Sequence, residues 1–320
     1  MKKYDVVALG ELLIDLTQND RSAQGNPMLE ANPGGAPCNV LALLQRLGRS
    51  TAFQGKVGSD GFGTQLEAAL KETGICTEGL RWDEYVHTTL AVVHTLPGGD
   101  RDFSFYREPG ADMRLTAEEL DEDMIRNCRI FHFGSLSMTA EPVRSATRRA
   151  ITLAEEAGVL RSFDPNLRIP LWSTLEEAKE QILFGLDHCD ILKISDNEIT
   201  WLTGEDDFDA GVRWIRERFP NIRLLLLSMG ADGSRAYSGD ASAEVPCFRV
   251  DTIETTGAGD TFFGGVLHHV LMWGLRDYTE AELRQMLRFA NAAAAIITTK
   301  KGALRVMPDE DAILALINSK

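Results

Sequence analysis

Short apolar runs and amphipathic stretches alternate along the first part of the chain. Tyr4–Leu9 is a β-rich apolar run that ends at a glycine, as expected for a buried strand. Apolar residues recur with helical spacing over Cys38–Leu47 and again over Gly63–Thr73, and Thr51–Val57 between them has strand character. This alternation predicts a parallel sheet covered by helices.

A hairpin signal then interrupts the alternation. Thr88–Leu96 and Asp102–Tyr106 are two strand-like runs, and the turn residues Pro97–Asp100 join them. Because the pair breaks the strand–helix order, we expect it to project as a small flap. The alternative is an edge hairpin of the main sheet.

The alternation resumes over the rest of the chain. We expect further strands at Ile130–Phe133, Leu160–Phe163, Ile191–Ile194, Leu224–Ser228 and Phe248–Val250. We expect further helices at Glu141–Ala157, Asp209–Phe219, Thr261–Trp273 and Glu282–Thr298. The sequence contains no repeat, low-complexity tract or linker, so residues 1–320 are predicted to form one α/β domain with a small β appendage.

Composition narrows the class of protein. With 44% hydrophobic and 25% charged residues, the 320-residue chain has the profile of a soluble globular protein. A net charge of −15 argues against binding to nucleic acid or to an anionic membrane surface. No apolar run approaches the about 18–20 residues of a membrane span. The five cysteines are scattered and form no CxxC pair, which favours reduced thiols and a cytoplasmic location.

The most informative segment is a glycine-containing turn, Thr255–Asp260, between a predicted strand and a long helix. Gly257 and Gly259 allow close approach of the backbone to a ligand. The free N–H groups and the dipole of the following helix favour a bound anion, and a phosphate is the natural guest.

Asp260 stands beside these N–H donors. The helix dipole is expected to keep its carboxylate ionised, so that it can orient a hydroxyl and accept its proton late in a loose phosphoryl-transfer transition state. The alternative is that Asp260 only caps the helix, and the two roles can coexist.

A second glycine-containing loop, Pro33–Asn39, precedes the first predicted helix. Its small residues allow close approach, and Asn39 offers both donors and an acceptor, which suits a neutral polyhydroxyl ligand. The alternative is a simple loop with a helix cap. The chain has no GxxxxGK[ST] motif and no GxGxxG after the first strand, which argues against a P-loop enzyme and a nicotinamide oxidoreductase.

Together these segments resemble the ribokinase-like (PfkB-type) carbohydrate kinases over nearly the whole chain, and within that family the fructokinases. The TTGAGD run at residues 255–260 is similar to the family's C-terminal signature, and residues 32–63 are similar to its N-terminal signature. Ser195 stands where ribokinases usually carry Asn. The fructokinase-like runs are PGGAPCN at 33–39, DPNLRIPLW at 164–172, KISDNE at 193–198 and LTG at 202–204.

The resemblance implies a central, mostly parallel sheet flanked by helices, with a β lid formed by segments near 12–33 and 88–110. It also implies ATP-dependent phosphorylation of fructose to fructose 6-phosphate, with ATP as co-substrate and Mg²⁺. We expect a homodimer through the lid, since an unpaired strand edge invites pairing.

The resemblance further assigns site residues. Asp260 would be the catalytic base, and Gly257, Ala258 and Gly259 would form the anion hole. The matching sugar positions are Asp15, Gly34, Gly35 and Asn39, with Arg107 and Arg168 near the sugar or the phosphates. The matching nucleotide positions are Lys193, Ser228, Gly230, Gly233 and Asn291, with Glu198 organising the water shell of Mg²⁺.

Three of these roles also suit the residue types. Asp15 can accept two hydroxyl hydrogen bonds, Glu198 offers the hard oxygen that Mg²⁺ prefers, and Arg168 has a planar fork suited to phosphate. The alternatives are that Asp15 is a solvated strand end, that Glu198 is an ordinary glutamate at a helix start and that Arg168 forms a surface ion pair.

One position departs from the family pattern. Glu254 stands where the family often has an Asp that helps to hold a monovalent cation, with the Thr256 carbonyl among the other ligands. Potassium activation is therefore a hypothesis. Other open alternatives are a kinase for 2-keto-3-deoxygluconate, a riboside or ribose, and, more remotely, a non-catalytic sugar or nucleotide sensor.

Overall fold

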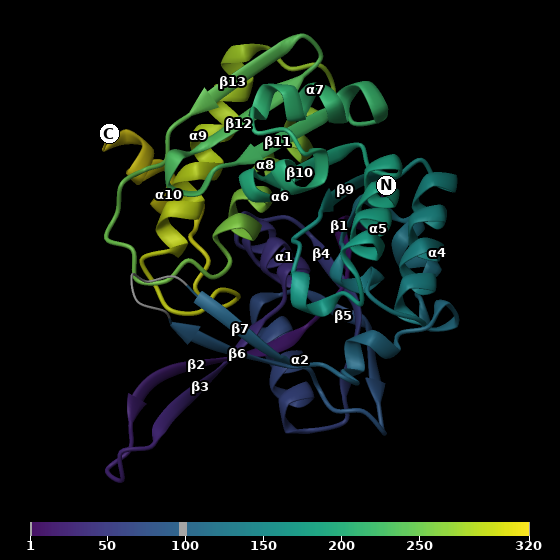
Figure 1. The fold of residues 1–320 in the computed structure, drawn as a ribbon, viewed down its shortest axis with the longest axis vertical. Coiled ribbons are helices and arrows are strands. Elements are labelled where there is room, and N and C mark those ends of the chain that lie inside the picture. Colours follow the sequence, from purple (N-terminus) through teal and green to yellow (C-terminus); the bar gives the residue numbers. More distant parts are fainter. Residues whose placement is uncertain (1, 96–100, 320) are drawn as a thin grey trace.

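The computed structural model describes residues 2–95 and 101–319, and two β-sheets organise them (Figure 1). A nine-stranded sheet has the order β13-β12-β11-β10-β9-β8-β1-β4-β5, and a four-stranded sheet has the order β3-β2-β6-β7. The large sheet is parallel from β5 to β11 and becomes antiparallel only at β12 and β13. The expected α/β architecture, with a central, mostly parallel sheet and a small β appendage, is therefore confirmed.

The strands of the large sheet are short and mostly buried. Their bounds are β1 Tyr4–Leu9, β4 Thr51–Gly58, β5 Cys76–Asp83, β8 Cys128–Gly134, β9 Leu160–Asp164, β10 Ile191–Ser195, β11 Leu224–Ser228, β12 Ser234–Ser238 and β13 Ala241–Val245. Alternate residues enter different cores, because successive side chains of a strand point to opposite faces. Val6 and Ala8 of β1 belong to one hydrophobic cluster, and Val7 and Leu9 to the other.

Helices cover both faces of this sheet. One core contains residues of α1 Ala36–Arg46, α2 Gly61–Thr73, α8 Ala258–Trp273, α9 Glu280–Ile297 and α10 Glu310–Asn318. The other contains residues of α3 Glu122–Arg126, α4 Val143–Glu156, α5 Leu175–Asp187, α6 Asp196–Thr203 and α7 Phe208–Arg218. A parallel sheet needs this covering, since both of its faces are apolar.

The four-stranded sheet extends from the body of the molecule, with the β2–β3 hairpin reaching farthest (Figure 1). It consists of β2 Leu13–Arg21, β3 Pro27–Gly34, β6 Leu90–Thr95 and β7 Arg101–Tyr106. The paired strands β6 and β7 thus belong to a separate sheet and not to the edge of the large one. The predicted turn between them, Pro97–Asp100, lies outside the described residues.

One predicted strand is wrong. Residues 246–250, which include the expected strand Phe248–Val250, have no regular secondary structure. The sheet instead ends in the antiparallel hairpin β12–β13 just before them. Phe248 packs on the core from this irregular segment, and β13 forms the edge of the sheet.

The topology gathers the ends of several strands at one place. β9, β10 and β11 run parallel, so their carboxyl ends, at Asp164, Ser195 and Ser228, share one edge of the sheet. Ligands of open α/β sheets bind at this edge. In the described part of the chain, no helix is long and apolar enough to cross a membrane.

Candidate active site

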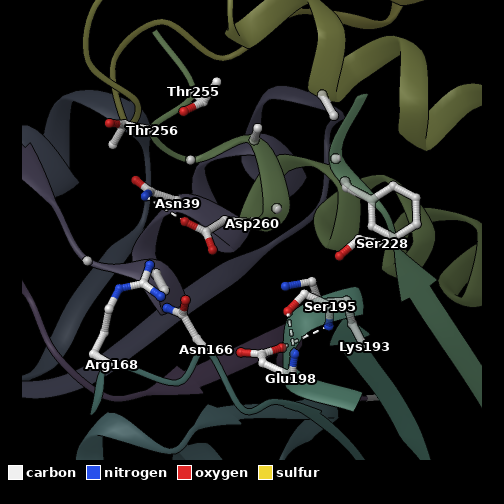
Figure 2. Close-up of a pocket in the computed structure, with 18 of the residues that line it drawn as sticks. Asn39, Asn166, Arg168, Lys193, Ser195, Glu198, Ser228, Thr255, Thr256 and Asp260 are labelled. Carbon is white, nitrogen blue, oxygen red and sulfur yellow. Dashed lines mark hydrogen bonds between the residues drawn. The ribbon is translucent and has the colours of Figure 1, made fainter. Parts of the chain in front are cut away.

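A cavity of about 630 Å³ opens at the carboxyl ends of these strands. Residues from both sheets and from the starts of α1, α6 and α8 line it, so segments far apart in the sequence meet there (Figure 2). Its lining includes Asp15, Asn39 and Phe105 as well as Ser228, Gly233 and Asn291, and Figure 2 shows Asn39 and Ser228 on different sides of Asp260.

The start of α8 forms one wall of the cavity. Gly257 is the N-cap residue in a left-handed conformation, with φ 75°, and no side chain caps the helix there. A Cβ atom on Gly257 would lie 2.8 Å from the Cβ of Ala303, so this turn requires glycine both for its conformation and for its packing. The first helical turn therefore lines the cavity and favours an anion, although the Ala258 N–H also donates to the Thr255 carbonyl at 3.2 Å.

Asp260 lies on the first turn of α8, and its carboxylate points into the cavity (Figure 2). Its Oδ2 accepts a 2.9 Å hydrogen bond from Nδ2 of Asn39. Since Gly257 is the cap and has no capping side chain, the alternative that Asp260 only caps the helix is excluded. Burial raises the pKa of Asp260, against the opposing effects of the Asn39 hydrogen bond and the positive charges of Lys193 and Arg168.

Asn39 occupies the first half of α1 and is 3% exposed. Within the described part of the chain, its Oδ1 is buried without a hydrogen-bond partner. A buried amide oxygen without a hydrogen-bond partner costs stability. Asn39 thus offers a fixed donor to Asp260, while its oxygen is enclosed by the protein on the side away from the Asp260 carboxylate.

The loop before α1 approaches the end of β1 closely. Gly35 has φ 125°, and a Cβ there would lie 2.4 Å from the carbonyl oxygen of Glu11. Gly34 is similar, since its Cβ would lie 2.2 Å from Oδ2 of Asp15. Gly34 does not line the cavity itself, but it makes room for Asp15, which does.

Two side chains face Asp260 from the loop after β9. Asn166 and Arg168 both line the cavity, and Figure 2 shows them opposite the Asp260 carboxylate. Asn166 has φ 44°, the left-handed conformation that asparagine tolerates better than most residues. Arg168 brings a positive charge close enough to oppose the raised pKa of Asp260.

Lys193 and Glu198 lie on the β10 side of the cavity. The Lys193 ammonium pairs with Asp164 Oδ2 at 3.0 Å, and both side chains are almost fully buried. The Glu198 carboxylate accepts the N–H of Ser195 at 2.8 Å and the N–H of Leu167 at 2.7 Å. Burial raises the pKa of Asp164 to about 7, and the charges of Glu198 and Asp260 add to this effect while Lys193 opposes it.

The nucleotide-side residues expected from the sequence all line the cavity. Gly233 has φ 106°, and a Cβ there would lie 2.2 Å from the carbonyl oxygen of Val245. Asn291 uses its amide within the protein, since Nδ2 donates to Val245 at 3.0 Å and Oδ1 accepts from Ser234 at 2.8 Å. Asn291 therefore shapes this part of the cavity by fixing β13 to α9.

Arg107 does not line the cavity, contrary to the expectation that it contacts the sugar or the phosphates. Its guanidinium is 3% exposed and pairs with Asp112 at 2.7 Å. It also donates to Thr139 Oγ1 at 3.0 Å and to the Leu136 carbonyl at 2.9 Å. These contacts place Arg107 as a buried anchor at the end of β7.

Glu254 also lies outside the cavity lining, whereas Thr256 is part of it. Glu254 is buried, and its Oε2 accepts the N–H of Gly302 at 3.1 Å. The Glu254 N–H in turn donates to the Thr298 carbonyl at 3.0 Å. The loop after α9 is thereby held against the segment that leads into the glycine turn.

Sequence reasoning missed several cavity residues, namely Glu11, Phe105, Asn166 and Cys247, and missed Asp164 behind the cavity wall. Asp164 and Asn166 belong to a run that was recognised, but only Arg168 was singled out there. Glu11 follows the glycine that ends β1, and burial raises its pKa to about 7. An acidic residue directly after a buried strand was the available signal.

Comparisons with known proteins decide the family. The model of the pfkB family carbohydrate kinases matches residues 3–310. The chain belongs to this family. The kinase is 44% identical to a probable fructokinase-4 of Arabidopsis thaliana over 99% of its own chain and 97% of the relative. It is likewise 44% identical to fructokinase-1 of Zea mays, over 98% and 97% of the two chains.

Solved structures agree in fold with the kinase. A fructokinase from Xylella fastidiosa with bound ATP matches with a TM-score of 0.89 and 32% identity, covering 100% and 99% of the two chains. A fructokinase double mutant from Vibrio cholerae O395, with fructose, ADP and potassium ion bound, matches with a TM-score of 0.87 and 30% identity, covering 99% of each chain.

Proposed function

We propose that this kinase transfers the terminal phosphoryl group of ATP to D-fructose and forms fructose 6-phosphate and ADP. The observation that carries the proposal is the position of Asp260, held by Asn39 at the mouth of the glycine turn of α8. The full-length similarity to fructokinases supports fructose as the acceptor. Structures of similar fructokinases with ATP, or with fructose and ADP, support the pairing of these substrates.

The acceptor would bind at the end of the cavity lined by Asp15 and Asn39. Asp15 would accept sugar hydroxyls, and Asn39 would border the sugar while its amide holds the Asp260 carboxylate in place. The hydroxyl to be phosphorylated would donate to Asp260, because a general base must lie within hydrogen-bond reach of the proton that it removes.

The donor would extend from the glycine turn toward the other end of the cavity. The backbone amides of Gly257, Ala258 and Gly259 would donate to the transferred phosphoryl group, and Arg168 would add a positive charge from the opposite side. The alcohol oxygen then bonds to the terminal phosphorus, the bond to the ADP oxygen breaks, and the proton passes to Asp260. The remaining phosphates and the base would lie toward Lys193, Ser228, Gly230, Gly233 and Asn291.

The donor set also fits Mg²⁺. The described residues include no group of three His, Cys, Asp or Glu side chains that could hold a metal directly. Mg²⁺ usually keeps several waters and binds one or two carboxylates together with substrate phosphates. Each oxygen of Glu198 already accepts one backbone N–H, which leaves further lone pairs for metal-bound waters. Mg²⁺ would neutralise part of the phosphate charge.

A monovalent cation would bind behind the turn, near Glu254 and the Thr256 carbonyl. The buried Glu254 carboxylate holds the Gly302 amide beside this segment, and a cation would offset its charge. A similar fructokinase structure contains a potassium ion. Rates in potassium and in tetramethylammonium test this assignment; we expect activation by potassium, and equal rates would remove it.

The four-stranded sheet would act as the lid of a single-domain enzyme. Its segments, near 12–33 and 88–110, contribute Asp15 and Phe105 to the cavity. Closure would exclude water, which competes with the sugar hydroxyl for the phosphoryl group.

β3 is an edge strand with exposed Met28 and Leu29, which supports a homodimer formed through the lid. Five free cysteines support action in the cytoplasm.

A panel of acceptors tests the proposal. The purified enzyme is incubated with ATP, Mg²⁺ and one acceptor at a time: fructose, ribose, a riboside or 2-keto-3-deoxygluconate. We expect the highest kcat/KM with fructose. A higher value with another acceptor would reassign the sugar, and no acceptor-dependent ADP formation at all would favour a non-catalytic sensor.

A further inference from the structure

The ion pair between Asp164 and Lys193 lies directly behind the cavity wall. Asp164 ends β9, Lys193 lies on the neighbouring parallel strand β10, and their side chains are only 4% and 8% exposed. Both carboxylate oxygens contact the ammonium, at 3.0 and 3.1 Å. Lys193 itself lines the cavity.

Stability alone is a poor reason for this pair. Taking two charges out of water costs about as much as their attraction returns, so buried ion pairs are weak contributors to folding. Here the ammonium is also placed among other charged cavity residues, because Glu198 and Asp260 add to the attraction of Asp164 and raise the pKa of Lys193 despite its burial. Burying the Lys193 ammonium beside a phosphate-binding turn is costly, which indicates that this positive charge has a role in function.

The ammonium is directed at the glycine turn. A Cβ on Gly259 would lie 3.3 Å from Nζ of Lys193, so the ammonium packs against the backbone of the turn and a larger residue there would press on it. Asp260, one residue farther along α8, is a competing anion for the same ammonium. Without Asp164, the flexible lysine could pair with Asp260 and neutralise the catalytic base.

Asp164 makes a second contact, to the loop after β9 that forms part of the cavity wall. Its Oδ1 also accepts the N–H of Asn166 at 3.2 Å. This bond spans the turn in which Asn166 adopts its left-handed conformation and faces the cavity. One carboxylate thus orients both the ammonium on β10 and the loop that carries Asn166 and Arg168.

We propose that Asp164 is a positioning residue for phosphoryl transfer: it holds the Lys193 ammonium against the Gly257–Asp260 turn and away from the Asp260 carboxylate. The ammonium then stabilises the negative charge of the transferred phosphoryl group as the bond between this group and ADP lengthens. This inference rests on the proposed kinase activity and assigns Asp164 no contact with either substrate.

The test compares Asp164→Asn, Lys193→Met and the double variant with the wild-type enzyme. Asp164→Asn should lower kcat about 10- to 100-fold, while the KM for fructose changes less than about twofold. The double variant should match Lys193→Met, because the amide oxygen in Asp164→Asn still accepts the Asn166 N–H and the remaining effect of Asp164 passes through the lysine. Asp190→Asn is the matched control, since it breaks the ion pair between Arg161 on β9 and Asp190, the residue directly before β10, outside the cavity lining. It should affect the melting temperature and leave kcat unchanged.

A wild-type kcat in Asp164→Asn, or losses that multiply in the double variant, would overturn the proposal. If Asp164→Asn does not fold, Asp164→Glu keeps the charge and displaces it by one methylene, and an unchanged kcat in that variant would also overturn it. Failure of the proposed kinase function would look different from failure of the Asp164 proposal, because the wild-type enzyme would then form no ADP with any sugar.

Discussion

At the scale of single residues, the chemistry of the cavity depends on two buried polar side chains, Asn39 and Asp260, that are hydrogen-bonded to each other. Asn39 donates to Asp260, and its own oxygen has no partner among the described residues. Burial raises the pKa of Asp260, which makes it a better proton acceptor once it is ionised. Asn39 therefore fixes the position of a carboxylate that lines the cavity.

Asp15→Ala should weaken sugar binding without removing catalysis. A hydrogen bond to a charged group contributes about 1.5–3 kcal/mol, so the KM for fructose should rise about 10- to 100-fold. The KM for ATP should stay unchanged. Asp20→Ala, an exposed position on the same strand, is the control and should behave as wild type. An unchanged KM for fructose in Asp15→Ala would contradict the sugar assignment.

Glu11→Gln should change how stability depends on pH. Burial raises the pKa of Glu11 from 4.5 to about 7, so the folded wild type keeps its proton where the unfolded chain has lost it. Wild-type stability therefore falls as pH rises from 4.5 to about 7, by up to about 3 kcal/mol from this group. The amide retains the acceptor for the Ala36 N–H and removes the titration.

Melting temperatures at pH 5 and pH 8 check this prediction. The difference between Glu11→Gln and the wild type should grow in favour of the variant at the higher pH. Other titrating groups, such as Asp164, cancel in the comparison because both proteins contain them. A difference that is equal at the two pH values would contradict the assigned pKa.

At the scale of secondary-structure elements, the buried strands and long helices were predictable from the sequence. The apolar periodicity located β1, β4 and α8, because these elements pack on the core along their whole length. β2 and β3 were missed as strands, since much of their surface is exposed and their sequence is polar. The predicted strand Phe248–Val250 was wrong, because a short apolar run can also be an irregular segment packed on the core.

The site was predictable where a motif dictates backbone conformation and less so where tertiary packing decides. Gly257, Asp260 and Asn39 lie together in the cavity as expected. Arg107 lies outside the cavity lining, because it is buried against Asp112 in a contact between the end of β7 and the following turn. No local pattern marks such a contact.

The glycine turn of α8 provides a test at this scale. Gly257→Ala combines left-handed strain, about 1 kcal/mol, with a contact at 2.8 Å to Ala303. Gly204→Ala is the matched control, because Gly204 has nearly the same dihedral angles and open space around it. Gly257→Ala should lose more stability and at least about tenfold in kcat, since the amides of the turn must shift. Equal kcat values in the two variants would contradict the role of the turn.

At the scale of the whole molecule, the two sheets have different structural roles. The large sheet is buried between helices and fixes the carboxyl ends of β9, β10 and β11. The small sheet contributes only its base to the cavity, while its far end is exposed. We therefore expect the small sheet to be the part of the molecule that responds most to the sugar.

Amide hydrogen exchange checks this expectation. Saturating fructose should slow exchange in β2, β3, β6 and β7, because closure orders a sheet with few buried contacts. The α7 helix, far from the cavity lining, serves as the internal reference and should exchange at the same rate. Uniform protection of both regions, or none in the small sheet, would contradict a lid role.

The most direct test of the account follows phosphate from ATP in the wild type and in Asp260→Asn. Phosphorus NMR identifies the product, and a coupled assay gives the rate of ADP formation. We predict that the wild type forms fructose 6-phosphate and ADP in equal amounts, and that Asp260→Asn stays folded and loses about 10²–10⁴-fold in kcat. A variant with near-normal turnover, or a wild type that forms no fructose 6-phosphate, would contradict the central claim.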